Sequence, residues 1–104
     1  MNLDLVKGQI KAWKFRLSDH AEEERNNDGI EIREIRQALL SAELLEDYPQ
    51  DKRGPSCLLL GFDAQNRPIH VVCGLDKNEI VVIITVYVPS MPKWKNPRER
   101  NIVI

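Results

Sequence analysis

Residues 57–89, CLLLGFDAQNRPIHVVCGLDKNEIVVIITVYVP, contain the long β-branched and aliphatic runs of the chain and therefore restrict its fold more than any other part. Three apolar segments, Cys57–Phe62, Pro68–Gly74 and Ile80–Val88, are separated by the sequences DAQN and LDKN. Both connecting sequences have the composition of turns, since Asn and Asp hydrogen-bond to nearby backbone and tolerate left-handed conformations. The pattern predicts an antiparallel meander.

The connecting sequences also predict how the second hairpin pairs. Lys77–Asn78 is interpreted as a two-residue turn, which pairs His70 with Thr85 and Pro68 with Tyr87. Side chains two positions apart on a strand point to the same face. His70, Thr85 and Tyr87 are therefore expected on one face of the sheet.

The first hairpin is expected to turn at Asp63–Asn66, which pairs Leu59 with His70 and places Gly61 beside the same patch. This register also places Cys57 opposite Val72.

The two cysteines, Cys57 and Cys73, fall on neighbouring strands of this meander. In the predicted register their side chains point to opposite faces. We expect both to be free, buried thiols without a disulfide or a metal-binding role.

Length and charge limit the classes of function. At 104 residues the chain is expected to form one domain over residues 1–104. The net charge of −1 and the pI of about 6.1 give no global positive field that would attract nucleic acid. The C-terminal segment 91–104 is locally basic. No stretch has the length of a membrane span and the N-terminus lacks the apolar core of a signal peptide, so we expect a cytoplasmic protein.

The part of the chain before the meander has mainly helical periodicity. The expected helices cover residues 3–13, a short segment that begins at Ser18 or Asp19 and ends before Gly29, and residues 31–42. A short alternating segment around Phe15 is expected to be an edge strand.

Residues 44–48 look extended, and residues 91–104 are expected to form an irregular tail that wraps the surface, anchored by Trp94. Helices followed by strands predict an α+β two-layer sandwich, in which N-terminal helices pack on an antiparallel meander of three to four strands. The helices would cover one face of the sheet. The other face, partly open, is where a functional site is expected.

Several sequence blocks carry a resemblance to a known family. The strings SDHAEEER, GI, DYP, GPSCLLLGF, RPIHVVCG, IITVYVP and PKWK resemble the small bacterial family called domain of unknown function 4258, over nearly all of residues 16–98. Members of this family are similar to compact ribonuclease toxins of the RelE and MqsR kind, and are often encoded beside a YgiT-type zinc-finger protein that looks like an antitoxin.

The resemblance implies the toxin of a type II toxin–antitoxin pair, with a RelE-like fold and endoribonuclease activity on mRNA, possible ribosome association and a YgiT-type zinc-finger antitoxin as partner. Many family members carry an arginine four residues after the histidine that corresponds to His20. This chain has Glu24 there and an arginine one place later, at Arg25.

Metal-independent RNA cleavage needs a base, an acid and a cation in one cleft, because a 2′-hydroxyl must be activated, a leaving oxygen protonated and phosphate charge stabilised. The candidate catalytic residues are His20, His70, Arg25 and Tyr87. The candidate RNA-binding residues are Arg67, Thr85, Lys93, Trp94 and Arg98. The chemistry predicts neither a cofactor nor a metal, since the two histidines lie far apart with no third ligand beside either.

Structural roles account for the same residues. A histidine in the strand IHVVCG can be a core residue whose ring bonds a neighbour, His20 can hydrogen-bond a loop, and Thr85 and Tyr87 are ordinary strand formers. The alternative function is a non-catalytic module that binds a protein or small ligand on the open face. The near-neutral net charge favours this alternative, whereas the family resemblance favours the nuclease.

Overall fold

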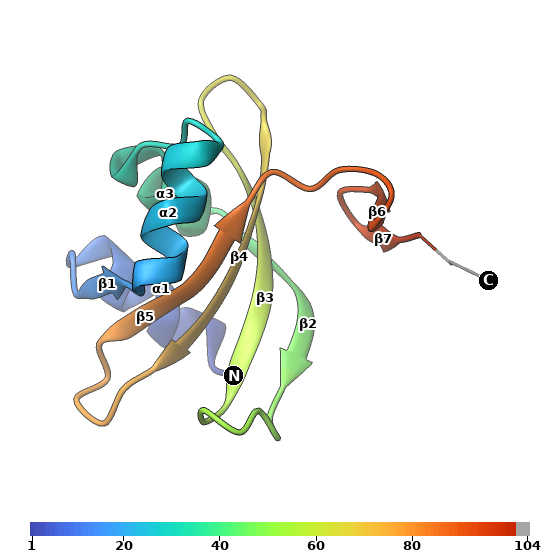
Figure 1. The fold of residues 1–104 in the computed structure, drawn as a ribbon. Coiled ribbons are helices and arrows are strands. Elements are labelled where there is room, and N and C mark those ends of the chain that lie inside the picture. The colour runs from blue at the N-terminus through green and yellow to red at the C-terminus, as the bar shows by residue number, and fades with distance from the viewer. Residues whose placement is uncertain (102–104) are drawn as a thin grey trace.

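A five-stranded sheet with the strand order β1-β5-β4-β3-β2 organises the chain, described here for residues 1–101 of a computed structural model (Figure 1). The strands are β1 (Phe15–Leu17), β2 (Glu43–Tyr48), β3 (Ser56–Phe62), β4 (Pro68–Leu75) and β5 (Val81–Tyr87). Strands β2 to β5 form the predicted antiparallel meander. The predicted edge strand is confirmed as β1, which extends the sheet by pairing in parallel with β5.

Three helices cover one face of this sheet (Figure 1). They are α1 (Leu3–Lys11), α2 (Asp19–Asn27) and α3 (Ile32–Leu40). Ser18 caps α2, since its side chain accepts the Ala21 N–H at 3.1 Å. Gly29, with φ of 65°, makes the left-handed turn between α2 and α3. The predicted α+β class is confirmed, and none of the helices within residues 1–101 combines the length and apolar character needed to cross a membrane.

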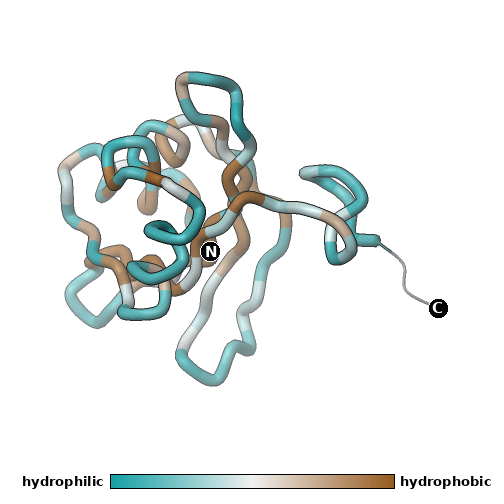
Figure 2. The backbone as a smooth tube through the Cα atoms, turned by 45° about the horizontal axis from the view of Figure 1, so that its top comes forward, coloured by the Kyte–Doolittle hydropathy of each residue, from teal (hydrophilic) through white to brown (hydrophobic). Residues whose placement is uncertain are grey.

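The hydrophobic core lies between the helices and the sheet. The hydrophobic residues lie in the strands and in the helices packed on them, whereas the turns are hydrophilic (Figure 2). Val6, Ile35 and Leu39 from the helices pack with Val71 and Ile83 from the sheet, all fully or almost fully buried. Burial of such side chains is the main favourable term in folding.

Gly61 allows α3 to approach β3 closely. A Cβ at this position would lie only 2.2 Å from the Ala38 carbonyl oxygen. Gly61 and Leu59 therefore face the helices, and the prediction that they border the His70 patch is wrong.

The register of both hairpins differs from the prediction. His70 lies opposite Tyr87 on β5 and opposite Leu60 on β3. The turn between β4 and β5 runs from Asp76 to Glu79, because the Asp76 carboxylate accepts the N–H groups of Asn78 and Ile80 at 2.8 and 3.0 Å. This longer turn replaces the predicted two-residue turn.

His70, Thr85 and Tyr87 nevertheless lie on one face of the sheet, as predicted, despite this change of register. The pairing of β4 with β5 around His70 and Tyr87 is shifted by two positions from the prediction, and two is the side-chain period of a strand. His70, Thr85 and Tyr87 therefore share the face of the sheet opposite the helices, called here the second face.

The cysteine geometry is a further consequence of register. The pairing of β3 with β4 is shifted by one position, which places Cys57 directly opposite Cys73. The two sulfur atoms are 4.0 Å apart. Both thiols are free and buried as predicted, but the prediction that they point to opposite faces is wrong.

The C-terminal segment covers part of the second face. It forms a small hairpin of β6 (Trp94–Asn96) and β7 (Glu99–Arg100) on the side of the sheet away from the helices (Figure 1). The sequence predicts irregular chain here, and residues 102–104 of that expected tail lie outside the described residues. Trp94 is buried, which confirms it as the anchor.

Candidate functional site

A cleft of about 410 Å³ opens where α2, the second face and the C-terminal segment meet. We call it the His20 cleft. Its lining residues are His20, Glu24, Tyr48, Leu58, Val72, Thr85, Tyr87, Lys93 and Arg100. The structure therefore brings together four of the predicted site residues, His20, Thr85, Tyr87 and Lys93, from three separate segments of the chain.

Helix α2 reaches this cleft because it lies along the edge of β5. Glu24 accepts the Val86 N–H at 3.1 Å and Asp28 accepts the Val88 N–H at 3.0 Å. Four residues of helix rise ~6.0 Å and two residues of strand ~6.6 Å, so the two carboxylates match alternate N–H groups of the strand. This alignment fixes the first turn of α2, with His20, beside Thr85 and Tyr87.

His20 and Glu24 form the polar pair at the mouth of the cleft. His20 Nε2 lies 3.3 Å from Glu24 Oε1, and the histidine side chain is 67% exposed. The same carboxylate oxygen accepts the Thr85 hydroxyl. In the tautomer that carries its proton on Nε2, on the side of the ring near Glu24, the lone pair is on Nδ1, where it can accept a proton from a bound molecule.

Tyr87 lines the inner end of the cleft, and the buried His70 lies behind it. His70 Nε2 is 2.7 Å from the Pro97 carbonyl oxygen, and its Nδ1 is 3.1 Å from the Tyr87 hydroxyl. A carbonyl oxygen only accepts, so Nε2 carries the proton and Nδ1 accepts from Tyr87. The Tyr87 oxygen in turn accepts the Trp94 indole N–H at 3.2 Å.

His70 itself is fully buried and does not line the cleft. Burial lowers its pKa from the ordinary value of 6.5, which favours the neutral ring. Its direct contacts are structural: the ring packs edge-on against Trp94, with centroids 4.3 Å apart. His70 can thus act on a bound molecule only through Tyr87.

Two cations lie at the end of the cleft formed by the C-terminal segment. Lys93 places its ammonium 5.7 Å from the centre of the Tyr87 ring and forms no ion pair within residues 1–101. Arg100 binds Glu46 through two hydrogen bonds of 2.8 Å and lies 4.7 Å from the Trp94 ring centre. These hydrogen bonds lower the pKa of Glu46 to about 2.

The sequence analysis missed Glu24 and Arg100 as residues of the site. The spacing of four residues between His20 and Glu24 on one helix is the signal that could have found the first. Arg100 has no comparable signal, because its position depends on the fold of the C-terminal hairpin.

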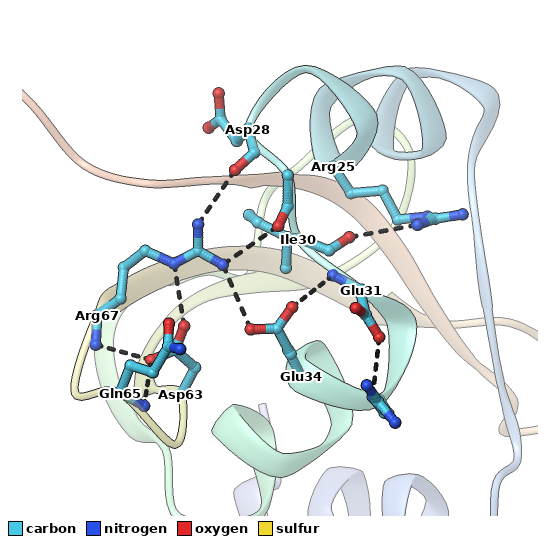
Figure 3. A network of polar contacts seen from close by, with 10 residues as sticks. Arg25, Asp28, Ile30, Glu31, Glu34, Asp63, Gln65 and Arg67 are labelled. Atoms are coloured by element: carbon cyan, nitrogen blue, oxygen red, sulfur yellow. Dashed lines mark hydrogen bonds and ion pairs between the residues drawn. The ribbon is translucent and has the colours of Figure 1, made fainter.

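Arg67 lies away from the cleft, in a polar network that joins the β3–β4 turn to the α2–α3 junction (Figure 3). Its guanidinium binds the Asp63 carboxylate at 3.0 Å, the Asp28 carbonyl at 3.1 Å and, at longer range, Gly29 and Glu34. These partners occupy the donors that an RNA phosphate would require. The structure therefore does not bring Arg67 together with the residues of the His20 cleft.

Arg25 and Arg98 are also held elsewhere. Arg25 binds Glu22 through Nε at 2.8 Å and donates to the Ile30 carbonyl at 3.2 Å, which stabilises the end of α2 (Figure 3). Position 25 lies on a different side of the helix from position 20, as five residues correspond to ~140° of rotation. Arg98 pairs with Glu43 at 2.7 Å. Neither side chain lines the cleft.

The described part of the chain offers no group of side chains suited to bind a metal ion. Within residues 1–101 no three His, Cys, Asp or Glu side chains are grouped so that they could hold a metal ion. The cleft offers an imidazole, two phenols, a carboxylate and two cations.

Comparison with known proteins gives one match. The profile of the family described as "Domain of unknown function (DUF4258)" matches residues 17–88. No curated protein and no solved structure matches the chain. The matched region contains His20, Glu24 and Tyr87, whereas Lys93 and Arg100 lie beyond its C-terminal end.

Proposed function

The chain belongs to the family "Domain of unknown function (DUF4258)", and we propose that it is a metal-independent endoribonuclease that cleaves mRNA. The single observation that carries this proposal is the meeting of His20, Tyr87 and Lys93 in one cleft. These side chains are of the types needed for a base, an acid and a phosphate-binding cation.

His20 takes the role of the base. Its Nδ1 accepts the proton of a 2′-hydroxyl, and the 2′-oxygen forms a bond to the adjacent phosphorus. Glu24 holds the ring in place through Nε2 and stabilises the imidazolium that results. Glu24 is thus a positioning residue.

Tyr87 takes the role of the acid. The bond from phosphorus to the 5′-oxygen breaks, and the Tyr87 O–H rotates away from His70 Nδ1 and gives its proton to that leaving oxygen. Burial raises the pKa of Tyr87, which keeps the phenol protonated at neutral pH, as an acid must be. The tyrosinate that remains is stabilised by the Trp94 N–H, which already donates to the Tyr87 oxygen.

Lys93 and Arg100 supply positive charge that the net charge of the chain does not. A Lys ammonium without a protein ion pair is free to bind a phosphate oxygen. Arg100 is partly neutralised by Glu46, so Lys93 carries the larger share of phosphate binding. Trp94 positions Tyr87 through its indole N–H, and Thr85 positions Glu24 through its hydroxyl.

The proposal extends to the biological setting that the family resemblance implies. The protein is the toxin of a type II pair, similar to RelE and MqsR toxins, and its partner is a YgiT-type zinc-finger antitoxin. An α+β fold with helices on one sheet face supports this likeness at the level of fold class. A small protein with paired CxxC motifs encoded beside this one would support the assignment of the partner.

A non-catalytic binding module that uses the same cleft is the second candidate. The observation in its favour is that His70 is buried and fully bonded, which leaves His20 as the exposed histidine of the cleft. A module of this kind would bind a protein or a small ligand without changing it.

Cleavage of a fluorescently labelled single-stranded RNA by the purified protein separates the two candidates. We expect His20→Ala to lower the cleavage rate about 100-fold or more, the usual scale for a general acid or base. Lys93→Ala should also slow cleavage, whereas Lys95→Ala, which changes an exposed lysine outside the cleft two residues further along the chain, is the matched control and should cleave at the wild-type rate. Wild-type cleavage by His20→Ala, or no cleavage by the wild-type protein, contradicts the nuclease assignment.

A further inference from the structure

A second cleft, of about 470 Å³, lies beside the His20 cleft and has no part in the mechanism above. We call it the Arg16 cleft. Its lining residues are Arg16, Ser18, His20, Arg53, Gly54, Pro55, Gly74, Leu75, Asp76, Val82 and Ile84. His20 lines both clefts and therefore lies at their junction.

The strand register shows that the two clefts share one floor. In the Arg16 cleft, Val82 lies between Arg16 on β1 and Gly74 on β4. Val72, two positions from Gly74 along β4, lies opposite Thr85 and belongs to the His20 cleft. Both rows are on the second face, and the distance along β4 from Gly74 to His70 is ~13 Å.

Each end of this floor carries two basic side chains, and all of them except Lys93 pair with a carboxylate within residues 1–101. Arg16 and Arg53 lie at one end, and Lys93 and Arg100 at the other. Arg16 is 60% exposed, and its ion pair with Asp76 has a long distance of 3.9 Å, so its guanidinium is available to another anion. Between the charged ends the floor includes the apolar side chains of Val82 and Val72.

Arg53 is held differently. Two hydrogen bonds of 3.2 and 3.0 Å fix its guanidinium against the Asp51 carboxylate, which also accepts the Ser56 hydroxyl at 2.7 Å. A planar guanidinium fixed at its edge by a carboxylate still presents a flat face. Such a face stacks on an unpaired nucleobase.

We propose that the Arg16 cleft is a second nucleotide subsite, which binds single-stranded RNA next to the scissile phosphate. Arg16 contacts a phosphate, Arg53 stacks on the base, and the strand runs past His20 to Lys93. This inference rests on the proposed ribonuclease function, because His20 joins the subsite to the reacting groups. A strand with phosphates on both sides of an apolar floor matches the charge distribution of the two clefts.

Binding of a short 2′-O-methyl oligoribonucleotide, measured by fluorescence anisotropy, tests the subsite separately from catalysis. Methylation blocks the attacking oxygen, so the probe is bound without being cleaved. We expect Arg16→Glu to weaken binding about tenfold or more and Arg16→Gln to weaken it less, with the slope of log Kd against log salt falling by about 1 in the Gln variant. The matched control is Arg33→Glu, which makes the same charge change at a 79% exposed residue of α3.

The outcomes distinguish the subsite from the nuclease. The subsite is overturned if Arg16→Glu and Arg16→Gln bind the probe as tightly as wild type, or if Arg33→Glu weakens binding as much as Arg16→Glu does. In either case, cleavage by the wild-type protein would still support the nuclease. If wild type binds and does not cleave, and Arg16→Glu loses binding, the subsite stands and the nuclease fails. Failure of the wild-type protein to bind the probe overturns the subsite.

Discussion

Both ring nitrogens of His70 are hydrogen-bonded. Nε2 donates to the Pro97 carbonyl oxygen, and Nδ1 accepts from the Tyr87 hydroxyl. The ring therefore ties the C-terminal segment to the centre of the sheet. A second proton on Nδ1 would leave two donors, the imidazolium and the phenol, facing each other. The neutral ring is thus part of the native structure.

The first prediction follows from this pairing and concerns pH. Burial lowers the pKa of His70 in the folded protein below the ordinary value of 6.5, so the unfolded chain binds its proton first as the pH falls. The stability that the neutral ring contributes is present above about pH 6.5 and is lost below it, by up to about 1.4 kcal/mol per pH unit.

Urea unfolding between pH 7.5 and pH 5 measures this loss, with His70→Gln as the comparison because glutamine cannot take up the proton. The wild-type protein should lose more stability than the variant over this interval. Equal losses in the two proteins would show that His70 does not bind a proton on unfolding.

The second prediction concerns the contact of Gly61 with α3. Gly61→Ala places a methyl group 2.2 Å from the Ala38 carbonyl oxygen, so the helix must move or the strand must bend. We expect a loss of about 1 to 3 kcal/mol in the free energy of unfolding, the usual cost of overpacking.

Gly8→Ala is the matched control, because a Cβ there meets no atom within 4 Å. In the middle of α1 this substitution should stabilise the protein by about 0.5 to 1 kcal/mol, since alanine favours helix. Chemical denaturation of both variants gives the two signs. A neutral Gly61→Ala variant would mean that α3 is not held as closely as described.

At the scale of elements, α2 covers part of the edge of β5, where an additional strand could otherwise pair. Glu24 and Asp28 accept two N–H groups that would otherwise be an unpaired strand edge. Open edges are a risk for aggregation, and covering them with another element is a common solution. The same contacts bring His20 to the cleft, so edge protection and site geometry have one cause.

The third prediction tests this role of α2. Glu24→Ala leaves the Val86 N–H and the Thr85 hydroxyl without their acceptor, which should lower the free energy of unfolding by about 1 to 3 kcal/mol. Glu24→Gln keeps an acceptor oxygen and should lose less. Glu23→Ala, an exposed neighbour, should change stability by less than about 0.5 kcal/mol.

Hydrogen exchange at Val86 gives the local readout. Its N–H should exchange faster in Glu24→Ala than in Glu23→Ala. Similar protection in both variants would contradict the assignment of Glu24 as the acceptor.

At the scale of the whole molecule, the order of helices and strands up to Tyr87 could be predicted because periodicity and caps are local, whereas the β6–β7 hairpin was not predicted. The alternation in residues 57–88 and the Ser18 cap each depend on a few neighbouring residues. Register was harder, since the turn after Leu75 and the bulge between Ile83 and Thr85 depend on backbone hydrogen bonds that composition does not reveal.

The site could be predicted only in part for the same reason. Thr85 and Tyr87 share a face by strand period, which sequence reveals. The contribution of His20 depends on where α2 lies against β5, and the contribution of Lys93 depends on the path of the chain after Pro89. The position of Arg67 outside the cleft could not be predicted, because nothing local indicates that α2 and α3 supply acceptors for its guanidinium.

The central claim is that the His20 cleft cleaves RNA by attack of the 2′-hydroxyl without a metal ion. The most direct measurement is the identity of the product ends when purified protein acts on a defined RNA in the presence of a chelator, with His20→Ala beside it. We expect 2′,3′-cyclic phosphate or 3′-phosphate ends and 5′-hydroxyl ends, formed by the wild-type protein and reduced about 100-fold in the variant. Products with 5′-phosphate ends, cleavage abolished by the chelator, or the same products at the same rate from His20→Ala would contradict it.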